Sequence, residues 1–322
     1  MELLTVAAEE EGERLDRFLA SRTGRSRAEI QRLIKAGKVL IDGRPAKPSH
    51  PLRSGECVTI ELPPPSPPDL RPKPEPLPLK IIYEDEEIIV VDKPAGMVTH
   101  PGPGHLRGTL VNALLHHCPL AETDDPRRPG LVQRLDRETS GVLVAAKTRE
   151  AYRSLVEQFK LREVRKRYLA LVHGVIAEDE GLIELPLRRA RLQRRKIAVD
   201  ASGKGAITEF SVLGRFPSEG KTLVEARPRT GRTHQLRVHF RYIGHPIVGD
   251  RKYGRKGDEA QNQRMMLHAW EIELTHPRTG RSLRFTAPPP EEFAPWLARA
   301  RLQGPAGGSP APQDKRGRSP GR

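Results

Sequence analysis

Residues 130–148, which read GLVQRLDRETSGVLVAAKT, decide the fold. The stretch begins as a polar loop, turns at a Thr-Ser-Gly tripeptide and ends in the apolar run 142–146, which predicts a loop entering a buried strand. Asp136 lies between Arg134 and Arg137 in this loop, and nearby positive charge favours the ionised carboxylate. Asp136 is therefore a candidate nucleophile or base. The alternative is a salt bridge that only organises the turn.

Around this loop, residues 79–302 alternate short apolar runs with helical patterns. The expected strands are 79–83, 88–93, 142–146, 168–172, 208–213 and 222–227, and the expected helices are 109–117, 149–160 and 233–242. No glycine-rich phosphate loop follows a strand, so a doubly wound nucleotide-binding fold is not indicated. We expect the α+β class, with a mixed, largely antiparallel β-sheet flanked by helices.

Residues 1–62 predict a small α/β unit of their own. Leu15, Phe18 and Leu19 have the spacing of a short amphipathic helix. Ser26 and Glu29 form an S-x-x-E capping box that opens a second helix. Between residues 14 and 47 we count ten basic residues against three acidic ones, which predicts a strongly positive face.

Two further segments complete the expected domain organisation. Residues 63–78 include nine prolines in sixteen positions, which predicts an extended, semi-rigid linker between residues 1–62 and 79–302. Residues 303–322 form a low-complexity basic tail that we expect to be disordered.

The overall charge points to a polyanionic partner. A net charge of +15 and a pI near 10.1 favour RNA as a partner through phosphate neutralisation. The alternative is that the excess charge serves only to keep the protein soluble.

Cys57 and Cys118 are the only cysteines, which excludes a disulfide scaffold and argues against a Cys-ligated zinc. No apolar stretch approaches the roughly 18 residues of a membrane span. The N-terminus is acidic where a secretory signal would be basic, so we expect a cytoplasmic protein without a membrane partner.

A second cluster of candidate residues lies in RPRTGRTHQLRVHF, residues 227–240. Thr233 is the expected N-cap of a helix that carries Arg237. A helix N-terminus beside Arg232 and Arg237 suits the binding of a phosphate or a carboxylate. An equally good interpretation is a basic helix face that is only solvated. Tyr168 begins an apolar strand, where tyrosine is more often a half-buried core residue than a catalytic one. The basic run 188–196 predicts an exposed loop.

Five ordered blocks resemble the RluA/RluD-type pseudouridine synthases, which isomerise uridines in ribosomal and transfer RNA. They are DKPAGMVTHPGPG (92–104), QRLDRETSG (133–141), KRYLALVHG (166–174), TGRTHQLRVHF (230–240) and GHPIVGDRKYG (244–254). Residues 1–62 are similar to the small RNA-binding domain named after ribosomal small-subunit protein four. The arrangement most resembles the D type, whose members act on large-subunit (23S) ribosomal RNA.

This resemblance implies a role for single residues. Asp136 corresponds to the catalytic aspartate, Tyr168 to the tyrosine that stacks on the target base, and Arg237 to the basic partner of the aspartate. Arg134 corresponds to the side chain that fills the gap left by the flipped nucleotide. Gln133 departs from the pattern, because most members have histidine there.

Further basic residues are expected to bind RNA. They are Arg137 and Arg232 near the candidate site and Arg25, Arg27, Arg32 and Lys35 in the first unit. The reaction needs no cofactor and no metal, and we expect a monomer acting on ribosomal RNA. The alternatives are a non-catalytic RNA-binding or ribosome-assembly factor and an RNA glycosidase that frees the base.

Overall fold

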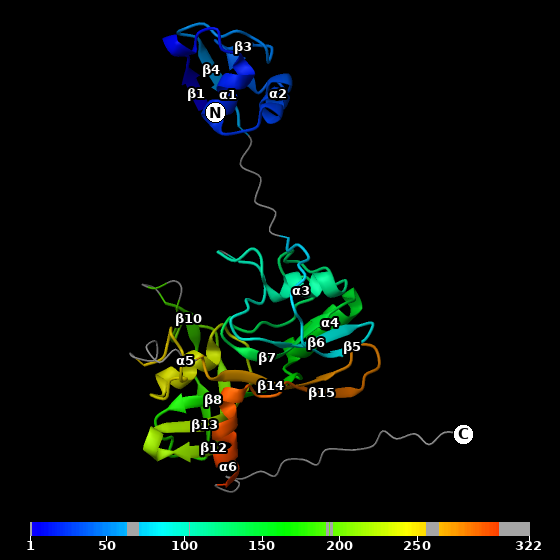
Figure 1. The fold of residues 1–322 in the computed structure, drawn as a ribbon, viewed down its shortest axis with the longest axis vertical. Helices are drawn as coiled ribbons and strands as arrows, with labels where there is room; N and C mark the ends of the chain where they lie inside the picture. The colour runs from blue at the N-terminus through cyan, green and yellow to red at the C-terminus, as the bar shows by residue number, and fades with distance from the viewer. Residues whose placement is uncertain are drawn as a thin grey trace, which may run out of the picture. The chain divides into compact units, whose positions relative to one another are not determined.

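The computed structural model describes residues 2–62, 71–102, 104–190, 193, 196–255 and 264–302. The chain divides into two compact units, Met1–Asp69 and Leu70–Arg322 (Figure 1). Half of the proline-rich stretch (63–70), part of the basic run 188–196 and the expected tail 303–322 lie outside the described residues. Within the described part, no helix is both long and apolar enough to cross a membrane.

The first unit packs two helices on a small antiparallel sheet. Its elements are β1 (Glu2–Thr5), η1 (Ala8–Glu10), α1 (Leu15–Thr23), α2 (Arg27–Lys35), β2 (Val39–Ile41), β3 (Arg44–Pro45) and β4 (Cys57–Ile60). The strand order is β1-β4-β2-β3. The predicted capping box is confirmed, because the Ser26 side chain accepts a hydrogen bond from the Glu29 backbone N–H at the start of α2.

The second unit is built on one large sheet. Its strands are β5 (Ile81–Glu84), β6 (Ile88–Lys93), β7 (Ser140–Ala146), β8 (Arg165–His173), β9 (Glu180–Glu184), β12 (Ile207–Phe216), β13 (Lys221–Pro228), β14 (Leu267–Thr275) and β15 (Ser282–Thr286). The order is β5-β6-β7-β14-β8-β13-β12-β9, with β15 on β14. β7 pairs with β14 in parallel, and the other described ladders of this sheet are antiparallel. The expected α+β class with a mixed, largely antiparallel sheet is confirmed.

Helices and a separate two-stranded ribbon flank the sheet. They are α3 (Leu110–His117), α4 (Arg149–Leu161), α5 (Gln235–Tyr242), α6 (Ala294–Leu302), η2 (Pro217–Glu219), η4 (Glu291–Phe293) and the ribbon of β10 (Leu187–Arg189) with β11 (Ile197–Val199). Helix α4 packs on β7, and α6 packs on β12 and β13 (Figure 1). One apolar core joins β6, β7, α3 and α4, and a second joins β8, β12, β13 and α5.

The sequence missed several elements of the second unit. β9, β14, β15 and α6 were not expected, and Arg188 and Arg189, at the start of the basic run 188–196, belong to β10 instead of a loop. Thr233 is not the cap of α5, because the N-cap is His234 and no side chain caps this helix. His234 has a φ of 56°, a left-handed conformation that turns the chain abruptly into the helix.

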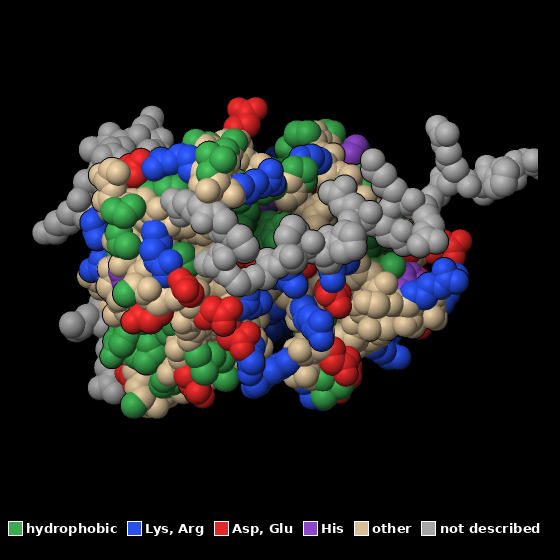
Figure 2. All heavy atoms as spheres, turned by 90° about the horizontal axis from the view of Figure 1, so that it is seen from below, with side chains coloured by type: hydrophobic (Ala, Val, Ile, Leu, Met, Phe, Trp, Pro, Cys, Tyr) green, Lys and Arg blue, Asp and Glu red, His purple; other side chains and the backbone are tan. Residues whose placement is uncertain are grey.

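Surface charge is mixed on the face seen from below. Figure 2 shows Lys and Arg side chains along the middle of this face, with Asp and Glu side chains close beside them. The positive excess is therefore not gathered into one uninterrupted patch on this face.

Candidate active site

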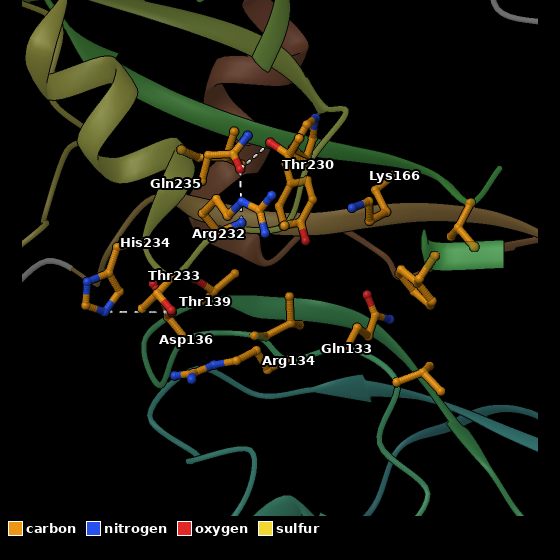
Figure 3. A pocket seen from close by; sticks show the side chains of 18 of the residues that line it. Gln133, Arg134, Asp136, Thr139, Lys166, Thr230, Arg232, Thr233, His234 and Gln235 are labelled. Carbon is orange, nitrogen blue, oxygen red and sulfur yellow. Dashed lines mark hydrogen bonds and ion pairs between the residues drawn. The ribbon is translucent and has the colours of Figure 1, made fainter. Parts of the chain in front are cut away.

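A pocket of about 610 Å³ opens where the loop before β7 faces β8, the end of β13 and the start of α5 (Figure 3). Five of the residues that the sequence singled out line it: Arg134, Asp136, Tyr168, Arg232 and Arg237. Gln133, where the sequence departs from the resembled pattern, also lines the pocket.

Strand register explains why Asp136 and Tyr168 share this pocket. Ala269 of β14 is the partner of Gly141 in β7 and also of Tyr168 in β8. The start of β7 and Tyr168 therefore lie at one level of the sheet, two strands and roughly 10 Å apart. Gly141 permits the close approach of β7 to β14, because a Cβ there would lie 2.1 Å from the Ala269 carbonyl oxygen.

Asp136 is paired with an arginine distant in the sequence. Arg237 donates from Nη1 to Asp136 Oδ2 at 2.8 Å, and the Asp136 side chain is 15% exposed. The expectation that Arg134 and Arg137 hold this carboxylate is wrong, because its described ion pair is with Arg237, as the family resemblance implied, while Arg137 pairs with Glu138. Because Arg237 approaches from α5, the carboxylate has a fixed direction that the local sequence does not reveal.

Asp250 holds the other side of the same guanidinium. It accepts from Arg237 Nε at 2.7 Å and from Nη2 at 2.8 Å, and its side chain is fully buried. Burial alone would lower the pKa of Arg237, but the hydrogen bonds with Asp250 and the charge of Asp136 outweigh it and raise that pKa. Arg237 therefore stays charged and bridges two carboxylates. The sequence did not single out Asp250, although it lies inside the block GHPIVGDRKYG.

His234 is a second neighbour of Asp136 that the sequence missed. Its Nε2 lies 3.9 Å from Asp136 Oδ1, and its Nδ1 lies 2.8 Å from the hydroxyl of Tyr253. Burial lowers the pKa of His234 to about 4, so the imidazole is neutral near pH 7. A non-glycine residue in the left-handed region beside a candidate catalytic group is a form of stored backbone strain.

Tyr168 lies in β8, between β13 and β14 in the middle of the sheet, and lines the pocket. It is partly buried and packs against both apolar cores of the second unit. Burial, with a smaller contribution from the charge of Asp136, raises the pKa of Tyr168, so the phenol keeps its proton near pH 7. The side chain thus combines a fixed aromatic ring with a hydroxyl inside the site.

Gln235 shapes the loop between β13 and α5. Its Oε1 accepts from the Thr230 hydroxyl at 2.7 Å and from the Arg232 backbone N–H at 3.0 Å, and its Nε2 donates to the Ile207 carbonyl at 2.9 Å. Arg232 is exposed at the pocket rim, where its Nε donates to the Gly205 carbonyl. The buried amide of Gln235 therefore fixes the backbone from which His234 and Arg237 project.

Lys93 ties a neighbouring loop to the Asp136 loop. This fully buried side chain donates from Nζ to the carbonyls of Pro94 and Met97 at 2.8 Å and of Arg137 at 3.2 Å. The Thr99 hydroxyl adds a hydrogen bond to the Leu135 carbonyl at 2.6 Å. Leu135 and Arg137, which flank Asp136 in the chain, are therefore both held through their backbone carbonyls.

We expect Lys93→Met to lower the free energy of unfolding by about 2–4 kcal/mol, because buried carbonyls would lose their donor. Denaturant titration of the purified variant measures this loss. Thr148→Val, which removes a hydrogen bond to Glu87 and the N-cap of α4 elsewhere in the unit, is a comparison variant with an expected loss of about 1–2 kcal/mol. A Lys93→Met protein as stable as the wild type would contradict the anchoring role.

The basic residues expected to bind RNA in the first unit lie on or beside α2. Arg27, Arg32 and Lys35 are exposed, and Arg25 is partly buried. Arg25 pairs with Glu29 at 3.1 Å, and Arg27 pairs with the buried Asp16 at 3.1 Å. Arg27 and Arg25 therefore also have structural partners.

Among the described residues of the whole chain, no group of three or more His, Cys, Asp or Glu side chains could hold a metal ion.

Comparison with known proteins identifies the class. The model of the RNA pseudouridylate synthase family matches residues 87–242, and the model of the S4 domain matches residues 13–58. An uncharacterised RNA pseudouridine synthase of Bacillus subtilis is 44% identical over 94% of this chain and 98% of its own length. Ribosomal large subunit pseudouridine synthase D of Nitrosomonas europaea is 40% identical over 92% of this chain and 87% of its own.

A solved structure agrees with these relatives. Human RNA pseudouridylate synthase domain containing 1 is 29% identical and superposes with a TM-score of 0.54 over 73% of this chain and 90% of its own. Fold and relatives together define an RNA-modifying isomerase. The chain belongs to the RNA pseudouridylate synthase family and carries an S4 domain at its N-terminus.

Proposed function

We propose that this RNA pseudouridine synthase modifies specific uridines of large-subunit ribosomal RNA in the cytoplasm, as a monomer, with Asp136 as its catalytic carboxylate. The observation that carries the proposal is the Asp136 carboxylate, paired with the buried Arg237 and lining a pocket that also contains Tyr168. The Nitrosomonas europaea relative is named for the large ribosomal subunit, and the net charge of +15 suits an RNA partner.

The reaction exchanges one glycosidic bond for another within a single nucleotide. The bond from N1 of uracil to C1′ of the ribose breaks, the base turns, and C5 bonds to C1′. N1 gains a proton and C5 loses one, so atoms and electrons balance without a second substrate. The reaction therefore requires a reactive carboxylate, a pocket for the base, and groups that manage the proton gained at N1 and the proton lost at C5. It does not require a redox cofactor.

Asp136 can serve each of the three routes open to this reaction. Its carboxylate can attack C1′ of the ribose, add to the base, or remove a ribose proton to form a glycal. All three routes require a carboxylate of fixed direction, and the hydrogen bond from Arg237 fixes that direction. Asp250 is then a positioning residue, because it acts on Asp136 only through Arg237.

The target uridine must leave its stack before Asp136 can reach it. Flipping a nucleotide costs a few kcal/mol, which a pocket offsets by stacking and polar contacts. We assign the stacking surface to Tyr168, whose ring lines the pocket, and the filling of the vacated position to the exposed side chain of Arg134. Arg137 and Arg232, both exposed, are assigned to the phosphate backbone.

Release of tritium from RNA labelled at C5 of uridine tests the function. C5 must lose its hydrogen when it bonds to the ribose, so we expect tritium release from a large-subunit ribosomal RNA transcript, and pseudouridine in its nucleoside digest. Free uracil without pseudouridine would mark a glycosidase. Binding without release from the wild-type protein would favour the non-catalytic alternative. Mapping by chemical adduct and primer extension would then locate the modified uridines.

We expect the S4 domain to dock RNA and not to take part in the chemistry. Deletion of residues 1–62 should weaken RNA binding and flatten its dependence on salt, because the phosphate contacts assigned to Arg27, Arg32 and Lys35 are removed. Some turnover on a short stem-loop should remain, since the pocket lies within the second unit. Binding isotherms at several salt concentrations, with single-turnover assays, measure both effects.

The control for this deletion is the full chain with Arg32→Gln and Lys35→Gln. These exposed residues should account for part of the lost salt dependence without any change in folding. A truncated protein that is folded and yet completely inactive on the stem-loop would contradict a pure docking role.

A further inference from the structure

Two polar side chains face one another at the end of the pocket away from Asp136. Figure 3 shows the amide of Gln133 and the amino group of Lys166 on opposite walls, on the side of the pocket away from Asp136 and His234. Gln133 belongs to the loop before β7, and Lys166 belongs to β8. A nucleotide that reaches Asp136 with its ribose would extend its base toward these two groups.

Gln133 has an unused donor in this place. Its Nε2 is covered by neighbouring protein atoms and has no hydrogen-bond partner among the described residues, so the amide must turn about its last side-chain bond before this donor can meet a ligand. An unsatisfied buried amide costs free energy, and such groups are rare unless a ligand completes them. The unpaired donor therefore indicates an acceptor that the protein alone does not supply.

Lys166 provides a second donor on the opposite wall. It lies two positions before Tyr168 in β8, so both side chains leave the same face of the strand. Its Nζ lies 5.7 Å from the centre of the Phe159 ring, and no carboxylate pairs with it in the described part of the chain. Burial lowers the pKa of Lys166 to about 8, which leaves a mostly charged amine near pH 7 with room for an acceptor.

We propose that Gln133 and Lys166 bind the imide edge of the flipped uracil, an inference that rests on the proposed function. This edge carries O2, N3–H and O4, an acceptor, a donor and an acceptor in a row. A glutamine amide donates to one carbonyl and accepts from N3–H, and the lysine donates to the other carbonyl. Cytosine presents an amino group where uracil has O4, so the lysine would face a donor. The pair thus selects uracil.

The same edge contacts also suit the turn that the base must make. A half-turn of free uracil about the line from N3 to C6 exchanges N1 with C5 and O2 with O4, and leaves N3–H in place. A receptor for the imide edge therefore makes equivalent hydrogen bonds before and after the turn. Gln133 and Lys166 hold the detached base against loss while C5 replaces N1 opposite the ribose.

Paired changes in enzyme and base test this proposal. The RNA is a synthetic hairpin that carries a mapped target uridine, or 2-thiouridine or 4-thiouridine at that position, because sulfur is a poorer acceptor than oxygen. We expect each thio substitution to lower kcat/KM of the wild type by about tenfold, and by similar factors because the turn exchanges the two positions. Gln133→Leu should lower kcat/KM with uridine about ten- to a hundredfold and make the enzyme nearly indifferent to sulfur.

Two matched variants sharpen the result. Gln133→Glu keeps the shape but turns the donor into an acceptor, so it should be less active than Gln133→Leu. Lys160→Met removes an exposed charge that also lines the pocket, and it should weaken RNA binding equally for all three bases. Lys166→Met should resemble Gln133→Leu in its reduced sensitivity to sulfur.

The possible failures are distinguishable. Absence of pseudouridine with the wild type would defeat the proposed function itself. Pseudouridine formation that Gln133→Leu slows by one constant factor for all three bases would overturn the edge contact and leave a structural role. Sensitivity of the Gln133 and Lys166 variants to the base beside the target, instead of to the target, would assign these residues to a flanking nucleotide and would equally overturn the proposal.

Discussion

Asp136→Asn is expected to lower the rate of pseudouridine formation by on the order of 10⁴-fold or more, while RNA binding stays within about a factor of three. Asparagine keeps the size of the side chain and still accepts a hydrogen bond from Arg237. It cannot attack the ribose, add to the base as an anion or remove a proton, so every route open to the reaction is closed. Single-turnover assays with excess enzyme separate this loss of chemistry from any loss of affinity.

The control for this variant is Asp125→Asn. Asp125 is also held by arginines, Arg127 at 2.7 Å and Arg128 at 3.3 Å, but it does not line the pocket. Its replacement should change the rate only slightly, since a partly exposed ion pair contributes little. Pseudouridine formation by Asp136→Asn at more than a few percent of the wild-type rate would defeat the assignment.

The loop around Asp136 could be predicted because its signals are local. The switch from polar residues to the run 142–146 marks the entrance to a strand, and β7 begins at Ser140. Asp136 and Tyr168 were nominated from their own segments, and the strand register brings both to one pocket. Their catalytic roles came from the family resemblance and stay proposals.

The partners of these residues could not be predicted from neighbouring sequence. Asp136 and Arg237 are separated by 101 positions, and the two adjacent arginines suggested a different ion pair, so only the family resemblance pointed to Arg237. Asp250 and His234 carry no local signal, since their importance depends on how α5 lies against the Asp136 loop. β14 was missed although it lies between β7 and β8. Long-range pairing of this kind is decided by packing and not by propensity.

Arg237→Met is expected to abolish activity and to lower the free energy of unfolding by about 3–5 kcal/mol. The change leaves Asp250 with a fully buried charge and no guanidinium, and it frees the Asp136 carboxylate to turn. Methionine keeps much of the arginine stem, so lost packing is a minor part of the effect. Urea titration and the tritium assay on one preparation measure the two losses together.

The double variant Arg237→Met, Asp250→Asn separates stability from catalysis. Removing the second charge relieves the unpaired carboxylate, so most of the lost stability should return. Activity should not return, because no cation would then hold Asp136 in place. Recovery of activity in the double variant would show that Arg237 serves the fold alone and not the carboxylate in the pocket.

The pH dependence of the single variant gives an independent check. In the wild type, burial would raise the pKa of Asp250, but the hydrogen bonds and charge of Arg237 outweigh it and lower that pKa. The stability from this pair is therefore present above the ordinary carboxyl pKa of about 3.9 and is lost only as the pH falls further. Without Arg237, we expect burial to outweigh the remaining hydrogen bonds from the Lys252 and Tyr253 backbone N–H groups, so that Asp250 takes up a proton on folding and the variant gains stability as the pH falls toward 5. The stability difference between wild type and Arg237→Met should thus shrink between pH 8 and pH 5, and a constant difference would mean that Asp250 is not the group left unpaired.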